Sequence, residues 1–166
     1  MLPARGAGGS GTMRLQLTRR SDYAVRASIA LALEVPGRGY LPAPRIAERM
    51  RIPRSFLPQV LGDLSRAGIV EAAAGSNGGY RLARPPILLP VLDVIEAVEG
   101  PARSGRCNLD DRACDGSAPC VLHATWEAAQ SAFIDILAGT SLADLAAAHR
   151  ASGATSGPTG PEGEKS

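Results

Sequence analysis

Three closely spaced cysteines are the residues of this chain best suited to chemistry. Cys107, Cys114 and Cys120 are its only cysteines, and His123 follows the last of them at the i,i+3 spacing of one helix face. Three thiolates and an imidazole can bind one metal centre, because sulfur and nitrogen ligands suit zinc and iron-sulfur cores. The segment RCNLDDRACDGSAPCVLH, residues 106–123, is therefore predicted to hold a metal and is called the cysteine stretch.

These residues alone leave the nature of the site open. An iron-sulfur cluster with three cysteine ligands and one other ligand keeps one iron labile, which suits a sensor. Zinc bound by the same four residues would be a structural site, and this is the less favoured interpretation. A third possibility is a metal-free thiol switch, in which Arg106 or Arg112 activates a nearby cysteine. The odd cysteine count argues against a disulfide framework and favours a cytoplasmic protein.

Charge divides the chain into two unlike halves. Residues 1–90 contain 13 Arg and five acidic residues, whereas residues 91–166 contain five basic and 11 acidic residues. The first half thus carries a net charge of +8 and the second −6, although the whole chain carries only +2. A concentrated positive excess is typical of a nucleic-acid-binding region. No run approaches the ~18 apolar residues of a membrane-spanning helix, so no membrane partner is expected.

The basic half begins with a predicted amphipathic helix. Thr18 is a suitable capping residue, and Val25, Ile29, Ala32 and Leu33 then share one helix face. This helix is expected to end near residues 35–37, where proline and glycine follow.

Two short helices with a tight turn are predicted next, which is the helix-turn-helix pattern. Pro44 opens the first helix, Arg51-Ile52-Pro53 breaks it, and the second helix starts near Ser55. With Ser55 as the N-cap, Pro58 is the third helical residue and its missing N–H costs no helical hydrogen bond. The second helix ends at Gly68. Its predicted inward residues are Leu57, Val60, Leu61 and Leu64. The residues left near its exposed start, able to reach base edges, are Ser55, Phe56 and Gln59.

A small hairpin is predicted after the second helix. Residues 69–72 and 80–82 have the character of strands, and the turn between them contains Asn77 followed by glycine. Asn77 would lie at the tip of this wing and contact DNA. The expected fold is mainly α, a winged helix-turn-helix domain with a β-hairpin wing and a long C-terminal dimerisation helix. The expected partner of the basic half is a double-stranded DNA operator.

The long helix is predicted from apolar residues at spacings of four, three, four and three after Cys120. This apolar stripe consists of Leu122, Trp126, Ala129, Phe133 and Ile136. It is interpreted as a dimer interface, and the alternative is that it packs in the core of the monomer. Gly139 ends the helix, and Ser141 with Asp144 starts a short helix that is expected to pack back on the dimer.

Several segments together resemble the Rrf2 family of bacterial transcription regulators: MRLQLTRRSDYAVRA, IPRSFLPQVLGDLSRAGIV, GSNGGYRLARP, DVIEAVEGP and the cysteine stretch. The similarity runs from about Met13 to about Ala148. It implies a homodimeric repressor or activator whose recognition helices enter successive major grooves while the wings reach the minor groove. It places Ser55, Phe56 and Gln59 on the recognition surface and implies phosphate contacts by the arginines. Those arginines are Arg19, Arg54 and Arg81.

The sequence departs from some cluster-binding members of this family at two positions. Pro58 stands where they have a glutamate, and Ala74 stands where they have an arginine before the wing glycines. The operator is therefore expected to differ from theirs.

The resemblance implies two candidates for the fourth cluster ligand. Regulators of cluster assembly bind a 2Fe-2S cluster through a histidine three positions after the last cysteine, which matches His123. Nitric-oxide sensors of the family bind a 4Fe-4S cluster through an aspartate in the first helix of the other subunit, which matches Asp22. We favour His123 and a 2Fe-2S cluster over Asp22 and a 4Fe-4S cluster. The residues leave two simpler roles open, since His123 could merely pack beside Trp126 and Asp22 could stabilise the first helical turn. The signal would be iron-sulfur status, nitric oxide or redox state.

The chain has no sequence signature of an enzyme. It lacks a glycine-rich phosphate loop followed by lysine and a nucleophile elbow, and it contains two histidines. An iron-sulfur carrier or electron-transfer protein is the alternative from a different class, but such a protein needs no recognition helix or wing. The predicted divisions are a disordered extension (1–12), the winged helix-turn-helix domain (13–86), a connecting helix (87–104), a cluster-binding loop (105–120), the dimerisation and C-terminal helices (121–150) and a disordered tail (151–166).

Overall fold

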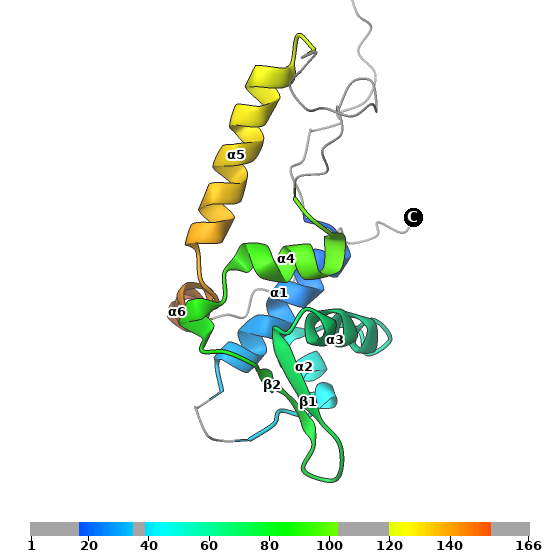
Figure 1. The fold of residues 1–166 in the computed structure, drawn as a ribbon. Helices are drawn as coiled ribbons and strands as arrows, with labels where there is room; N and C mark the ends of the chain where they lie inside the picture. The colour runs from blue at the N-terminus through cyan, green and yellow to red at the C-terminus, as the bar shows by residue number, and fades with distance from the viewer. Residues whose placement is uncertain (1–16, 35–38, 103–119, 154–166) are drawn as a thin grey trace, which may run out of the picture.

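The computed structural model describes residues 17–34, 39–102 and 120–153 (Figure 1). Its helices are α1 (Arg19–Ala32), α2 (Ala43–Met50), α3 (Leu57–Arg66), the short 3-10 helix η1 (Pro86–Leu88), α4 (Val91–Glu99), α5 (His123–Gly139) and α6 (Leu142–Ala151). Its strands are β1 (Val70–Ala73) and β2 (Gly79–Leu82). The predicted mainly helical fold with a hairpin wing is confirmed. The predictions for the N-terminal extension, for Cys107 and Cys114, and for the tail beyond residue 153 lie outside the described residues.

Helix α1 begins where the sequence indicates but buries a different face. The hydroxyl of Thr18 caps it by accepting a hydrogen bond from the N–H of Ser21 at 3.1 Å. The residues buried most deeply are Ala24, Ala27 and Ala30, whereas the predicted apolar face of Val25, Ile29, Ala32 and Leu33 is only half-buried. The reason is that α1 is central and packs against α2, α3, α4 and α6. Alanines let several helices approach it closely.

The helix-turn-helix forms as predicted, with one shift at its second helix. Pro44 lies in the first turn of α2, and Arg51 ends that helix in a left-handed conformation with φ 52° and ψ 44°. The N-cap of α3 is Phe56 rather than Ser55. Pro58 is therefore the second helical residue, where its missing N–H still has no partner inside the helix. Gly68, with φ 69°, reverses the chain after α3.

The wing is tied to the rest of the domain by a third segment. Strands β1 and β2 pair antiparallel, with Val70 opposite Leu82 and Ala73 opposite Gly79. Leu41 adds two hydrogen bonds of 2.9 Å to Tyr80, one in each direction between their backbone N–H and C=O groups. A Cβ atom on Gly79 would lie 2.5 Å from the carbonyl oxygen of Leu41. This close approach requires glycine.

Helix α6 packs on the core of its own chain, and the expectation that it also packs back on the dimer stays a prediction. Ser141 and Asp144 form the predicted capping box at its start. Leu142 is fully buried and its N–H donates to the carbonyl of Leu89 at 2.9 Å. The helix packs against α1 and η1, because its buried side chains complete the same core that α1 and α4 line.

Helix α5 stands apart from this core and extends away from the domain (Figure 1). None of its residues is buried. The exposed fractions of Trp126, Phe133 and Ile136 are 45%, 52% and 68%. The apolar stripe is therefore not part of the monomer core, and its pairing with a second chain stays a prediction. No helix within the described ranges is long and apolar enough to span a bilayer.

Candidate DNA-reading surface and cysteine site

The start of α3 presents the predicted base-reading residues to solvent. Ser55, Phe56 and Gln59 are exposed, while Leu57 and Leu61 anchor the opposite face of the helix in the core. The ring of Phe56 is 49% exposed and its other side packs on Tyr23 of α1, with ring centroids 5.6 Å apart. The contact of Tyr23 with Phe56 cannot be predicted from the sequence, because it joins two separate helices and leaves no local pattern. This packing holds Phe56 at the surface of the recognition helix.

A buried carboxylate fixes α3 to α1. The side chain of Asp63 is 4% exposed and forms ion pairs with Arg20 of α1 and with Arg66 one turn further along α3. A buried carboxylate needs such partners, because an unpaired charge in the core is strongly destabilising. The clamp is not among the contacts predicted from the sequence. The available signal in the sequence was the position of Asp63. It follows Val60 by three positions, which places a carboxylate on the inward face of an apolar helix.

The three predicted phosphate-binding arginines have different surroundings. Arg19 and Arg54 are exposed, and neither has an ion-pair partner among the residues that the structure describes. Arg81 instead pairs with Glu71 on the facing strand, at 2.7 Å between Nη2 and Oε2, and lies 4.8 Å from the centroid of the Tyr40 ring. Its hydrogen bond to Glu71 raises the pKa of Arg81 above the ordinary value. Because both Nε and Nη2 of Arg81 face Glu71, Arg81 has fewer donors left for a phosphate than Arg19 and Arg54, which are the better candidates.

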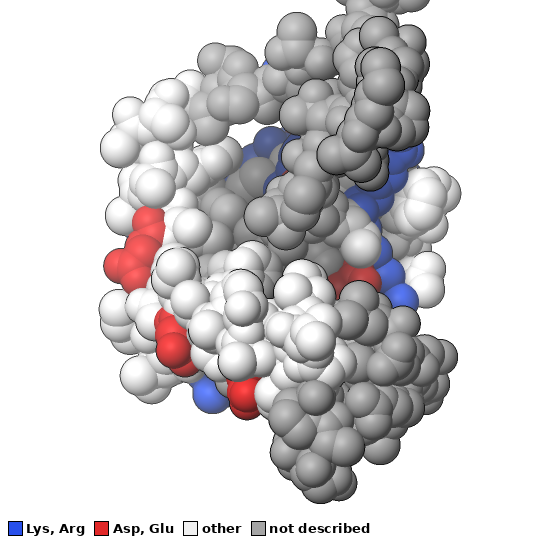
Figure 2. All heavy atoms as spheres, turned by 90° about the horizontal axis from the view of Figure 1, so that it is seen from above, with Lys and Arg blue, Asp and Glu red and all other residues white. Residues whose placement is uncertain are grey.

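The wing and the charge distribution complete this surface. Asn77 lies exposed in the turn between β1 and β2, as predicted. Seen from above, at the end opposite the wing, the visible acidic side chains lie mainly along the left edge and most of the visible basic ones toward the right (Figure 2).

The described part of the cysteine stretch is one turn of chain at the start of α5. Cys120 and His123 are both half-buried, and the N–H of His123 donates to the carbonyl of Cys120 at 3.0 Å. The Nε2 atom of His123 lies 3.3 Å from a carboxylate oxygen of Glu127. A thiol and an imidazole on one turn fit the sulfur and nitrogen ligands of a zinc ion or an iron-sulfur cluster.

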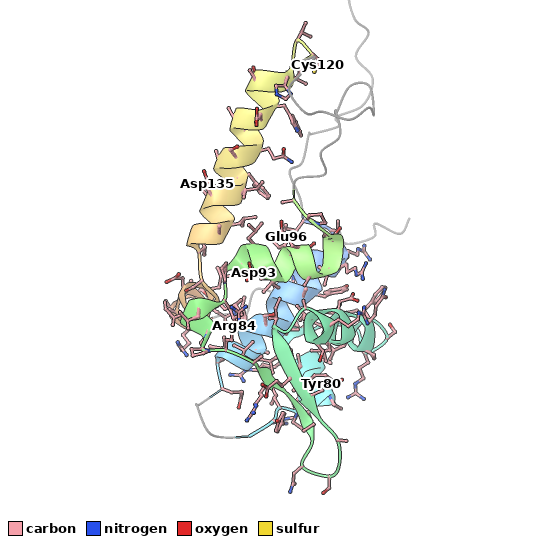
Figure 3. All side chains as sticks on the ribbon, in the orientation of Figure 1. Tyr80, Arg84, Asp93, Glu96, Cys120 and Asp135 are labelled. Carbon is pink, nitrogen blue, oxygen red and sulfur yellow. The ribbon has the colours of Figure 1, made fainter. Side chains whose placement is uncertain are left out.

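The structure does not bring the complete predicted ligand set together. No group of three potential metal ligands occurs within the described residues, and Cys107 and Cys114 lie outside them. Cys120 is at the end of α5 farthest from the wing residue Tyr80 (Figure 3). The alternative ligand Asp22 is on α1 and pairs with Arg26, at 2.9 Å between Oδ1 and Nε. The second carboxylate oxygen of Asp22 is not part of this ion pair, so Asp22 stays a candidate ligand.

A second contact that the sequence does not indicate joins the end of α4 to the start of α1. Glu99 is the last residue of α4 and accepts hydrogen bonds from the hydroxyls of Thr18 and Ser21, the latter at 2.8 Å. The hydrogen bond from Thr18 is the main reason that the pKa of Glu99 is lowered. Arg20, which clamps α3, contributes to the same lowering by its charge. The end of α4 is therefore joined to the start of α1, next to Arg20, which contacts the recognition helix α3.

Comparison with known proteins identifies the family. A family model described as "Iron-dependent Transcriptional regulator", the Rrf2 family, matches residues 17–148. The transcriptional regulator IscR of Aliivibrio salmonicida is 34% identical over 131 residues, which cover 79% of this chain and 77% of that protein. IscR of Vibrio cholerae is 32% identical, with coverages of 79% and 75%.

Solved structures show the same architecture. The structure of T. potens IscR is similar with a TM-score of 0.69 and 28% identity, and the match covers 89% of this chain and 97% of that one. CymR, described as the global cysteine regulator of B. subtilis, gives a TM-score of 0.66 at 26% identity, with coverages of 81% and 98%. These relatives are transcription regulators with a helix-turn-helix, not enzymes. The chain belongs to the Rrf2 family of winged-helix transcription regulators.

Proposed function

We propose that this regulator binds operator DNA as a homodimer and that a metal centre in the cysteine stretch controls its affinity. The proposed ligands are Cys107, Cys114, Cys120 and His123, and the proposed group is an iron-sulfur cluster, with 2Fe-2S favoured. The observation that carries this proposal is the turn at the start of α5, where a cysteine and a histidine lie three residues apart. The family description as iron-dependent supports iron over zinc.

The surroundings of the two candidate fourth ligands favour His123. His123 lies on the same turn as Cys120, at the start of α5. Asp22 lies on α1, where it is paired with Arg26 of the same helix. The 4Fe-4S alternative with Asp22 of a second subunit would use the carboxylate oxygen that does not pair with Arg26.

The proposed homodimer is supported by the surface of α5 and is consistent with DNA binding at two half-sites. The exposed apolar stripe of α5 is the surface that a second α5 would cover, and two α3 helices can then read two half-sites. A bound cluster would supply a centre whose state changes with iron supply, nitric oxide or redox conditions.

The chain's own residues offer a route from that centre to DNA. Glu99 holds the end of α4, from which the cysteine stretch continues, against Thr18 and Ser21 at the start of α1. Arg20 of α1 holds α3 through Asp63. A displacement at the start of the cysteine stretch would therefore reach the recognition helix through side-chain contacts within one domain. The coupling is lost if the metal-free and metal-loaded proteins bind every operator equally well.

The test is anaerobic purification of the full chain, with its visible spectrum and its iron, sulfide and zinc content. Two irons with sulfide per chain support 2Fe-2S and four support 4Fe-4S. His123→Ala is expected to reduce cluster retention, and the matched control is His149→Ala, which changes the chain's other histidine. Asp22→Ala and its control Asp135→Ala test the alternative ligand in the same way. Stoichiometric zinc without sulfide would contradict the cluster and make the site structural.

DNA binding is tested separately on the loaded and metal-free protein. Selection of bound sequences from a random duplex pool, at low salt, identifies the operator. We expect the two forms to differ in affinity for the selected duplex. A chain that holds a cluster but binds no DNA at low salt would contradict the regulator and favour an electron carrier.

A further inference from the structure

A small basic cleft lies between α1, the end of α2 and the end of α6, and it has no part in the function proposed above. Its volume is about 230 Å³. The residues that line it are Arg26, Ile29, Arg49, Met50, Arg51, His149 and Ser152. Three arginines, a histidine and two apolar side chains thus line the cleft, and no carboxylate is among the lining residues that the structure describes. We propose that this basic cleft binds a small phosphate-bearing anion.

The arginines keep donors free for such a ligand. Arg26 donates to Asp22 through Nε, and Arg49 donates to Glu34 through Nη1. A guanidinium has five N–H donors in a planar fork, so one ion pair leaves others available. These two pairs hold the side chains of Arg26 and Arg49, which line the cleft, while each guanidinium keeps further N–H donors. Arginine forks match the oxygen spacing of phosphate.

Arg51 is the residue that points most directly to a ligand. Within the described ranges it is the one residue other than glycine with a positive φ, at 52°, and it has no ion-pair partner there. Glycine or asparagine is the usual residue in the left-handed position that ends a helix, because a Cβ atom is strained in that conformation. An arginine in this position therefore costs stability while it places an uncompensated cation at the cleft. Such strain is expected where the side chain is needed for binding.

The size of the cleft limits the ligand class. Sites for drug-sized molecules usually have volumes of about 300–1,000 Å³. The cleft is smaller, so it suits a phosphate group with at most a short apolar substituent. Ile29 and Met50 would contact that substituent.

The test uses the full chain, without DNA, and inorganic phosphate as the probe. Phosphate is titrated against chloride at equal ionic strength, and binding is followed by the phosphorus NMR signal and by the melting temperature. We expect saturable binding with a raised melting temperature. Arg51→Gly should keep the fold, because glycine relieves the strained backbone, and should weaken phosphate binding by about tenfold or more.

Arg45→Ala is the matched control, because Arg45 is an exposed cation of the same helix that does not line the cleft. It should leave phosphate binding unchanged. The proposal is overturned if binding does not saturate, if Arg51→Gly binds phosphate like the wild type, or if Arg45→Ala loses as much affinity. A loss of duplex affinity in Arg51→Gly without any free-phosphate binding would assign the cleft to the DNA backbone instead and would also overturn it.

Discussion

The winged-helix domain and α5 place similar apolar side chains in opposite environments. In the domain, Leu61 and Leu64 are fully buried, whereas Phe133 and Ile136 of α5 are 52% and 68% exposed. Both pairs belong to helices with apolar residues at three-and-four spacing. The apolar side chains of the domain core are covered within one chain, whereas α5 presents apolar side chains that one chain leaves exposed to water. Periodicity therefore identifies an apolar face but does not tell a core from an interface.

The largest expected effect is the loss of stability when a core residue of the winged-helix domain is truncated. Leu61→Ala should lower the free energy of unfolding by about 2–5 kcal/mol, because it leaves a cavity among fully buried neighbours. Urea denaturation of dilute protein measures this loss. Ile136→Ala, measured under the same conditions, should cost much less. Equal losses would show that the two regions do not differ as described.

The interface side is tested by a charge in the apolar stripe. Phe133→Glu should weaken the proposed dimer by about a hundredfold, since the carboxylate would be desolvated without a partner. Sedimentation velocity over a range of concentrations measures the dissociation. Ala128→Glu is the control, because Ala128 is exposed on α5 but lies outside the stripe. A dimer that tolerates Phe133→Glu would place its interface elsewhere.

The DNA-reading surface should separate two kinds of contact. Gln59→Ala is expected to cost about 1–3 kcal/mol on the preferred operator and little on random duplex, because a glutamine amide reads base edges. Arg54→Ala should weaken binding to all duplexes and reduce its salt dependence, as loss of a phosphate contact does. Fluorescence anisotropy at several salt concentrations distinguishes these outcomes. If Gln59→Ala and Arg54→Ala lose affinity equally on operator and random duplex, the two residues do not make different kinds of contact.

The contribution of Glu99, which joins α4 to α1, to the stability of the fold should depend on pH. The pKa of Glu99 is lowered from an ordinary value of 4.5, so its stabilising effect is present above that value and is lost as the pH falls through the folded pKa. Glu99→Gln should therefore reduce the melting temperature by a few degrees at pH 7, and this difference should shrink toward pH 3. Calorimetry across this range checks the sign. A melting-temperature difference that grows in acid would contradict a stabilising role of the ionised Glu99 side chain.

The smallest effect concerns a buried hydroxyl in the centre of the domain. Ser28 is fully buried, and its Oγ has no hydrogen-bond partner in the part of the chain that the structure describes. Ser28→Ala should raise the free energy of unfolding by about 1 kcal/mol, because an unsatisfied buried polar group is removed. Chemical denaturation measures this change. A destabilised Ser28→Ala protein would mean that the hydroxyl has a partner in solution.

Local signals in the sequence determined the elements of this fold. Thr18, Pro44, Gly68 and Ser141 mark helix ends through their own backbone preferences and caps, which act within a few residues. The Asn77 turn predicted the wing for the same reason. The segments that resemble the Rrf2 family led to the correct family, and the cysteine spacing led to a site hypothesis that the described residues do not test.

Only the tertiary structure decided which side chains face the core and which contacts join distant segments. It buries the alanine face of α1, returns α6 to its own domain and leaves the α5 stripe exposed. The contacts of Asp63 with Arg20 and of Glu99 with Ser21 join residues 43 and 78 positions apart. Pairs so far apart produce no short-range pattern, because they form only when packing brings separate helices together. Caps and periodicity are local properties, whereas the environment of a helix face depends on every element that packs against it.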